Sequence, residues 1–224
     1  MALVPPGPIE TRTIAVQVGG LEVRLEALKD FEGVLDFYAR EHPAEVELIP
    51  YYGVLWPSGL ALAEHIAGRF RSLAGVRAVE LGCGLGLPSI VAARLGARVL
   101  ATDFHPGNER LLRRNAELNG LDIEYLPMRW ESPPEGRSFA LVLGSDLVYE
   151  RKSLGALAAC AARLCAPGGR IVLSDPGRDN LQEAVSRIEG LGFASSIAVA
   201  GDCFIVEMTR PCEITRESAS SAPR

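Results

Sequence analysis

Residues 76–103 read VRAVELGCGLGLPSIVAARLGARVLATD. An apolar run ends at Glu80, three alternate glycines follow, and an apolar stretch then leads to a second apolar run that ends at Asp103. This order predicts a strand, a glycine-rich turn, a helix and a second, parallel strand. The glycines allow a tight turn and a close approach of the backbone to a ligand. Because the Asp103 carboxylate can accept hydrogen bonds from ribose hydroxyls, the stretch predicts a nucleoside site.

The spacing of the glycines narrows the kind of nucleoside. A dinucleotide-binding turn requires its third glycine at position 87, where this chain has Leu87, so a nicotinamide-dependent oxidoreductase is disfavoured. The pattern from Glu80 to Gly86 is instead Glu-x-Gly-x-Gly-x-Gly. It resembles the first motif of the S-adenosylmethionine-dependent methyltransferases that have a seven-stranded Rossmann-like sheet. The plain alternative is an ordinary glycine-rich turn between a strand and a helix.

Composition limits the classes of protein to which the chain can belong. The chain has 224 residues, of which 48% are hydrophobic, enough for one sizeable core. Its formal charge of −5 argues against a broad basic surface, so we expect no nucleic-acid partner. No apolar run approaches the roughly 20 residues that span a bilayer, and the first residues lack a signal-like run, so we expect no membrane partner.

The five cysteines are odd in number and form no Cys-x-x-Cys pair. This pattern favours neither a zinc site nor a disulfide framework, and we expect no metal. It is typical of reduced thiols, mostly buried, in a cytoplasmic protein.

The chain divides into three parts. Residues 1–53 are expected to form an N-terminal addition, with a loose arm, a β-hairpin around Gly19-Gly20 and a short helix. Residues 54–210 alternate strands and helices and are expected to form the nucleoside-binding domain, a doubly wound α/β sheet. Residues 211–224 have little to bury and are expected to be disordered.

The elements of the domain follow from hydrophobic periodicity and breakers. The helix that follows Trp56-Pro57 is expected to have Ser58 as its N-cap. The last two strands are joined by a two-residue turn and are expected to form an antiparallel hairpin at one edge of the sheet. The predicted helices are 58–71, 87–95, 106–119, 152–165 and 179–191, and the predicted strands are 76–81, 97–102, 122–127, 139–144, 169–175, 194–200 and 203–209.

Ligands of doubly wound sheets bind at the carboxyl ends of the strands. Asp103 lies at such an end, and its alternative role is to cap the following helix. Trp130 follows the third strand, where it can pack on a flat heterocycle or belong to the core. Ser145 ends the fourth strand and is small enough to let a ligand approach, while Asp146 and Tyr149 follow it at the expected mouth of the substrate site.

Five motifs together resemble the family-16 seven-strand protein-lysine methyltransferases. They are W-P-x-G-x-x-L-A at 56–63, E-L-G-C-G-x-G-L-P at 80–88, T-D at 102–103, Trp130, and L-G-S-D-L-V-Y at 143–149. The resemblance covers about residues 50–175, and Arg129 departs from it, since the family often has an acidic residue there. It implies S-adenosylmethionine as the cofactor, and Asp146 and Tyr149 as the residues that orient the target amine. The cofactor contacts expected on these grounds come from Trp56, Glu80, Gly82, Cys83, Gly84, Asp103, Trp130 and Ser145.

Three functions remain open at this point. The first is methylation of a protein lysine, with a protein as the partner. The second is methylation of a small-molecule acceptor at nitrogen or oxygen, since the cofactor half of the site has the same motifs whatever the acceptor. The third is a cofactor-binding partner protein that has lost catalysis.

Overall fold

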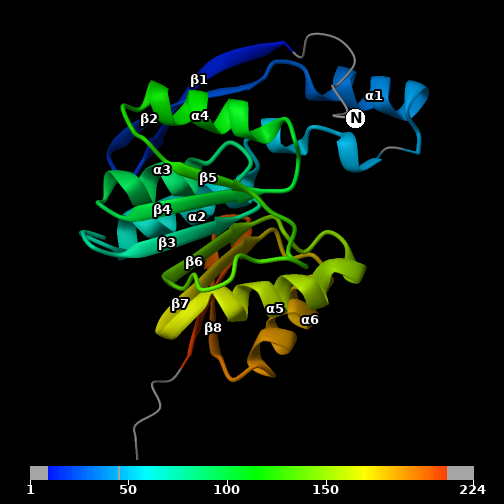
Figure 1. The fold of residues 1–224 in the computed structure, drawn as a ribbon. Helices are drawn as coiled ribbons and strands as arrows, with labels where there is room; N and C mark the ends of the chain where they lie inside the picture. Colours follow the sequence, from blue (N-terminus) through cyan, green and yellow to red (C-terminus); the bar gives the residue numbers. More distant parts are fainter. Residues whose placement is uncertain (1–9, 45, 211–224) are drawn as a thin grey trace, which may run out of the picture.

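The computed structural model describes residues 10–44 and 46–210, which Figure 1 traces along the chain. The arm expected at the N-terminus and the tail expected at 211–224 lie outside the described residues. Among the described residues, no helix is both long and apolar enough to cross a membrane.

The expected strands and helices are present, with bounds that differ by a few residues. The strands are β1 (Thr11–Val18), β2 (Leu21–Leu28), β3 (Arg77–Leu81), β4 (Arg98–Asp103), β5 (Glu124–Pro127), β6 (Phe139–Ser145), β7 (Cys165–Asp175), β8 (Ala194–Ala200) and β9 (Cys203–Thr209). The α-helices are α1 (Phe31–Glu41), α2 (Pro57–Arg69), α3 (Leu87–Arg94), α4 (Asn108–Leu118), α5 (Leu154–Leu164) and α6 (Asn180–Glu189). Short 3-10 turns are η1 (Val46–Leu48), η2 (Tyr51–Gly53) and η3 (Arg151–Ser153).

The main sheet of the described chain has seven strands in the order β5-β4-β3-β6-β7-β9-β8. Strand β3 pairs in parallel with β4 and β6, so the sheet grows outward from β3 in both directions. Strand β9 is antiparallel to both β7 and β8, which places β8 at the edge. The predicted α/β fold, Rossmann-like and doubly wound with a C-terminal antiparallel hairpin, is confirmed.

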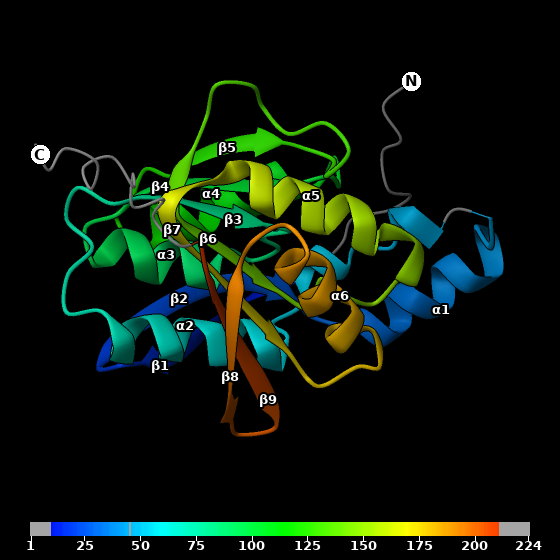
Figure 2. The same ribbon diagram turned by 90° about the horizontal axis from the view of Figure 1, so that it is seen from below.

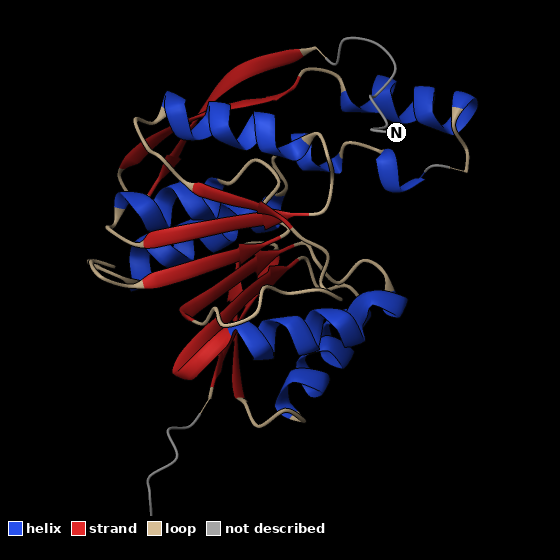
Figure 3. Ribbon diagram, viewed as in Figure 1, coloured by secondary structure: helices blue, strands red, loops and turns tan. Residues whose placement is uncertain are grey.

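Helices cover both faces of this sheet, as Figures 2 and 3 show. Successive residues of a strand point to opposite faces. On β3, Ala78 therefore belongs to the cluster that α2, α3 and α4 complete, while Val79 belongs to the cluster completed by α5 and α6. Both residues are fully buried. The apolar runs of the sequence are continuous because each central strand is covered on both sides.

The β1–β2 hairpin is a separate two-stranded sheet that packs against helices α2, α3 and α4. Two asparagine side chains of α4 complete the edge of β2. Asn119 accepts from the Arg24 N–H at 3.1 Å and donates to the Arg24 carbonyl at 2.7 Å. Asn115 accepts from the Glu26 N–H at 2.6 Å and donates to the Glu26 carbonyl at 3.3 Å. Side-chain amides thus bind β2 as a neighbouring strand would.

The start of α2 differs from the prediction. Trp56 is the N-cap and Pro57 occupies the first helical position, so the expectation that Ser58 caps this helix is wrong. Pro57 is favoured at that position because its missing N–H needs no partner there. Ser58 is instead fully buried, and its Oγ lies 3.6 Å from the Cys203 Sγ.

Candidate cofactor site

The carboxyl ends of the parallel strands carry most of the predicted residues. Glu80 on β3 is opposite Ala101 on one side and Leu143 on the other, close to the end of all three strands. Asp103 is the last residue of β4, and Ser145 is the last residue of β6. The loops that follow these strands therefore begin at one edge of the sheet, as the switch-point rule predicts.

The glycine loop, residues 82–86 between β3 and α3, is held by the Asp103 carboxylate. Its Oδ2 accepts the Gly84 N–H at 3.1 Å, and its Oδ1 accepts the His105 N–H at 3.0 Å. Gly84 has φ +50°, and a Cβ there would approach the Tyr52 carbonyl oxygen to 3.3 Å. Helix α4 is capped by Gly107, so the alternative role of Asp103 as its N-cap is excluded. Burial raises the pKa of Asp103, while the two N–H donors oppose this effect.

Asn108, which the sequence reasoning missed, ties the other side of this loop to α4. Its Nδ2 donates to the Gly84 carbonyl at 2.7 Å, and its Oδ1 accepts the Cys83 thiol at 3.4 Å. Asn108 and Cys83 are both buried. Burial raises the pKa of the Cys83 thiol, so the thiol stays neutral and acts as a donor. An asparagine in the first turn after the Asp103 loop is the signal that could have indicated this contact.

Glu80, on β3 just before the glycine loop, binds the first turn of α3. Its side chain is fully buried, and its Oε2 accepts the Ser89 N–H at 2.9 Å and the Ser89 hydroxyl. Its Oε1 has no hydrogen-bond partner among the described residues. Burial raises the pKa of Glu80 to about 8, and the bonds from Ser89 act in the opposite direction. The predicted cofactor contact of Glu80 stays a prediction.

We expect Glu80→Gln to flatten the pH dependence of stability. Since the pKa of Glu80 rises from its ordinary value of 4.5 to about 8 in the folded protein, the folded state binds the extra proton between these values. The wild-type protein therefore loses stability as pH rises through this window, by at most about 1.4 kcal/mol per pH unit. Thermal unfolding of both proteins from pH 5 to 8.5 measures the difference.

The glutamine side chain of that variant can still accept from Ser89, so the fold is retained. The pKa values of His65 and His105 are lowered chiefly by burial, and their effect is the same in both proteins and cancels. Parallel curves for the two proteins would show that Glu80 is not the titrating group.

Residues 46–56 lie over this loop. The Tyr52 ring packs against the His105 ring with centroids 4.5 Å apart, and the His105 Nε2 is 3.1 Å from the Leu48 carbonyl oxygen. Glu47 forms an exposed ion pair with Arg129 at 3.2 Å. Tyr52 and His105 were not predicted to belong to the site, and the contact of this segment with the loop is the observation that adds them.

The two tryptophans occupy different surroundings. The Trp56 Nε1 donates to the Tyr51 carbonyl at 3.1 Å, and its ring meets the edge of Phe31 with centroids 5.8 Å apart. Trp56 therefore joins the N-terminal addition to α2. Trp130 is partly buried and packs with Leu126 against the α5 side of the core. These contacts leave the predicted cofactor contacts of both tryptophans untested, so they stay predictions.

The loop after β6 carries the predicted acceptor residues. The Ser145 Oγ faces the start of α2, 3.6 Å from where a Cβ on Gly59 would lie. Asp146 has φ +59° and forms an ion pair with Arg178 at 2.7 Å. The Tyr149 side chain is exposed. Its pKa is raised by partial burial and then by the nearby charge of Glu150.

Comparison with known proteins now decides the family. The sequence profile of a family described as lysine methyltransferase matches residues 50–185, more than half of the chain. This chain belongs to the lysine methyltransferase family. S-adenosylmethionine is the cofactor of this methyltransferase, as its family indicates.

Relatives of the methyltransferase include proteins with different acceptors. A ubiquinone biosynthesis O-methyltransferase from Methylocella silvestris is 32% identical over 152 residues, covering 67% of this chain and 59% of the relative. An electron transfer flavoprotein beta subunit lysine methyltransferase from Xenopus laevis is 31% identical over 132 residues, covering 58% of this chain and 53% of the relative. The chain spans only about half the length of the curated relatives it matches.

Solved structures share the fold. A 16S rRNA methyltransferase from T. thermophilus, in complex with AdoMet and guanosine, has a TM-score of 0.70 and 20% identity over 92% of this chain and 52% of its own. The N-methyltransferase NodS from Bradyrhizobium japonicum, with S-adenosyl-L-homocysteine, has a TM-score of 0.54 and 15% identity over 66% of this chain and 88% of its own.

The residues at the site fit the cofactor. The Asp103 carboxylate uses one acceptor position on each oxygen for the loop, and its remaining lone pairs suit the two ribose hydroxyls. Gly84 has no side chain to cover the loop, and a Cβ there would crowd the Tyr52 carbonyl oxygen at 3.3 Å. Glu80 offers one buried oxygen that has no donor among the described residues. These three residues are the ones we expect to hold the nucleoside and amino-acid parts of the cofactor.

Proposed function

We propose that this methyltransferase transfers a methyl group to the side-chain amine of a protein lysine. The observation that carries the proposal is the Asp146 carboxylate, whose Oδ2 is buried and has no hydrogen-bond partner among the described residues. A buried acceptor without a donor costs about 1–3 kcal/mol, and an amine N–H supplies the missing donor. The exposed Tyr149 follows in the same loop and offers a hydroxyl and a ring face to a cation. The family's lysine methyltransferase description supports the same acceptor.

The reaction depends more on how the protein positions the methyl donor and the acceptor than on catalytic groups that the protein supplies. S-adenosylmethionine supplies an electrophilic methyl group bonded to a sulfonium. A free lysine has a pKa of about 10.4, so its ammonium must release a proton to water before the nitrogen lone pair can attack, and the new N–C bond then forms as the S–C bond of the sulfonium breaks. Asp146 accepts an N–H from the amine and holds it in line. The Tyr149 hydroxyl oxygen accepts the second N–H of the amine, which leaves the nitrogen lone pair free to attack, and the raised pKa of Tyr149 keeps its phenol neutral.

We expect Asp146→Asn and Tyr149→Phe each to lower the rate of methyl transfer by about 10-fold or more, because each removes one group that orients the amine. Cofactor affinity is expected to change by less than about twofold, since neither side chain bonds to the glycine loop. Initial rates with labelled S-adenosylmethionine and calorimetric titration with S-adenosylhomocysteine measure the two effects. Unchanged rates in both variants would refute the orienting role.

A small-molecule acceptor is the second candidate, and the similarity to a ubiquinone biosynthesis O-methyltransferase favours it. Cell extract incubated with the enzyme and S-adenosyl-[methyl-³H]methionine separates the two functions. Label in protein, recovered as methyl-lysine after hydrolysis, supports the proposal. Label confined to the small-molecule fraction supports the second candidate.

A cofactor-binding protein without catalysis is the remaining alternative. It predicts binding of S-adenosylhomocysteine by calorimetry with no label transferred to any fraction of the extract.

The division of the chain at residue 53 and the cytoplasmic location stay predictions. A protein acceptor in the cytoplasm, with no nucleic-acid or membrane partner, is the setting in which we propose that the enzyme acts.

A further inference from the structure

Arg178 lies in the loop between β7 and α6, and Asp175 at the end of β7 fixes that loop. The Asp175 Oδ1 accepts the N–H groups of Gly177 and Arg178, both at 2.8 Å. Its Oδ2 accepts the Arg178 Nη1 at 2.6 Å. The Asp175 side chain is only 2% exposed. One carboxylate therefore determines both the backbone of the turn and the direction of the arginine side chain.

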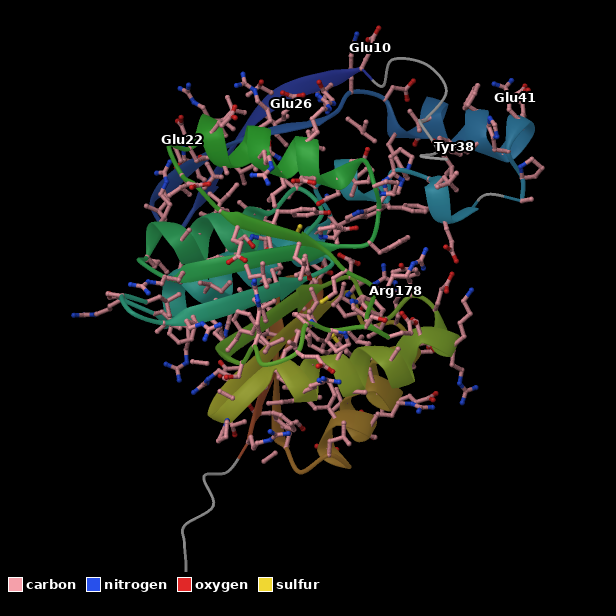
Figure 4. The ribbon with its side chains drawn as sticks, viewed as in Figure 1. Glu10, Glu22, Glu26, Tyr38, Glu41 and Arg178 are labelled. Carbon is pink, nitrogen blue, oxygen red and sulfur yellow. The ribbon has the colours of Figure 1, made fainter. Side chains whose placement is uncertain are left out.

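The guanidinium of Arg178 reaches from this turn to the neighbouring strand end. Its Nη2 lies 2.7 Å from the Asp146 Oδ1, on the residue that follows β6. The Asp146 N–H donates to the Ser174 carbonyl of β7 at 3.0 Å, which joins the two strand ends through the backbone as well. Figure 4 shows Arg178 on the side of the molecule where Tyr38 and Glu41 of α1 lie.

Asp146 is unusual in its backbone. Among the described residues it is the one non-glycine residue with a positive φ, at +59°. Aspartate tolerates this region better than most residues, yet the conformation persists only when the surroundings determine it. With Oδ1 bound to Arg178 and Oδ2 without a partner among the described residues, the carboxylate has one fixed oxygen and one free to accept a hydrogen bond.

The net charge of Asp146, Asp175 and Arg178 together is one that a single cation balances. Two carboxylates and one guanidinium leave a net charge of −1 at the end of β6 and β7 when all three are ionised. One ammonium group balances it, whereas a phenolate acceptor would add a second uncompensated negative charge. The planar guanidinium suits this task because its fork can bind two carboxylates at fixed angles, which an ammonium group cannot.

We propose that Arg178, held by Asp175, is a positioning residue that fixes the Asp146 carboxylate so that its Oδ2 receives the acceptor amine. The inference rests on the proposed function of Asp146 in orienting an amine. Arg178 acts through Asp146 and does not itself contact the acceptor. The ion pair would thus determine recognition of the acceptor and leave cofactor binding unaffected.

The experiment is a double-mutant cycle with Arg178→Met, Asp146→Asn and both together. Rates are measured against increasing concentrations of total cell-extract protein with labelled S-adenosylmethionine. We expect Arg178→Met to raise the apparent KM for extract protein by about 10-fold and to change kcat by less than about threefold. In the Asp146→Asn background the same change is expected to have less than about a twofold effect, since the two residues act as a unit.

Two further variants separate positioning from folding. Arg178→Lys keeps the charge without the fork and is expected to recover part of the KM but not all of it. Arg187→Met removes another arginine that pairs with a carboxylate on α6, and it is expected to behave as wild type. Titration with S-adenosylhomocysteine is expected to give the wild-type affinity for every variant, which a merely structural role of Arg178 would not require.

The outcomes distinguish the two proposals. An equal effect of Arg178→Met in both backgrounds, or a parallel loss of cofactor affinity, overturns the role of Arg178. If Asp146→Asn alone leaves the rate unchanged while the cofactor binds, the orienting role of Asp146 fails, and the role of Arg178 with it. If label enters only small molecules, the lysine proposal fails, and the same cycle run on the small-molecule fraction still decides the role of Arg178.

Discussion

An Asp103→Ala variant is expected to bind S-adenosylhomocysteine at least about 100-fold more weakly than wild type. The substitution removes the acceptor of the Gly84 N–H and of the His105 N–H together with the predicted acceptor of the ribose hydroxyls. Hydrogen bonds to a charged group contribute about 1.5–3 kcal/mol each, and about 2.7 kcal/mol corresponds to a 100-fold change. Isothermal titration calorimetry measures the affinity directly.

Asp122→Ala is the matched control, because Asp122 is exposed in the loop before β5. It is expected to keep wild-type affinity. Asp103→Asn is expected to be about as weak as Asp103→Ala, since an amide NH₂ would face one of the two backbone N–H donors. Wild-type affinity in either Asp103 variant would contradict the predicted ribose contact and the loop geometry derived from it.

Asn115→Leu is expected to lower the free energy of unfolding by about 3 kcal/mol. The Asn115 side chain is fully buried and bonds to the Glu26 N–H, the Glu26 carbonyl and, at 3.0 Å, the Leu85 carbonyl of the glycine loop. Each buried group left without a partner costs about 1–3 kcal/mol. For a domain of this size the midpoint of thermal unfolding should fall by roughly 6–12 °C, which calorimetry or circular dichroism measures.

Arg113→Leu is the control on the same helix, since Arg113 is exposed and pairs with Glu109 one turn away. Such a surface pair contributes about 0–1 kcal/mol, so the midpoint should move little. Asn115→Asp retains the acceptor for the Glu26 N–H but loses the donor and buries a charge, and we expect it to be at least as destabilising as the leucine variant. Equal midpoints for Asn115→Leu and Arg113→Leu would show that the amide contacts contribute nothing.

The sheet, and the position of the candidate cofactor residues at one edge of it, could be predicted because both follow from local patterns. The run from Glu80 to Asp103 contains the strand, turn, helix and strand in order, and its spacing distinguishes one class of nucleoside site from another. Strand ends meet at one edge in any parallel sheet, so placing Asp103 and Ser145 near the loop required no structure.

Contacts between distant side chains could not be predicted in this way. Hydrophobic periodicity shows that Asn115 lies on the buried side of a helix but not which backbone it binds, because the partner comes from a separate hairpin. Arg178 and Asp146 are 32 residues apart, and their ion pair depends on the turn that Asp175 organises. The N-cap of α2 was misplaced because Ser58 is a strong capping residue, whereas Pro57 sets the first helical position.

The paired asparagines of α4 also have a consequence for the geometry of the hairpin. Four residues of a helix rise about 6.0 Å, and two residues of a strand advance about 6.8 Å. The two repeats are close enough for Asn115 and Asn119 to match Glu26 and Arg24, but the mismatch of about 0.8 Å grows with each further repeat. A helix can imitate a strand over two pairs of residues and no further. These two pairs fix the register of β2 against α4. Sliding β2 by one residue would present its other face and break all four hydrogen bonds at once.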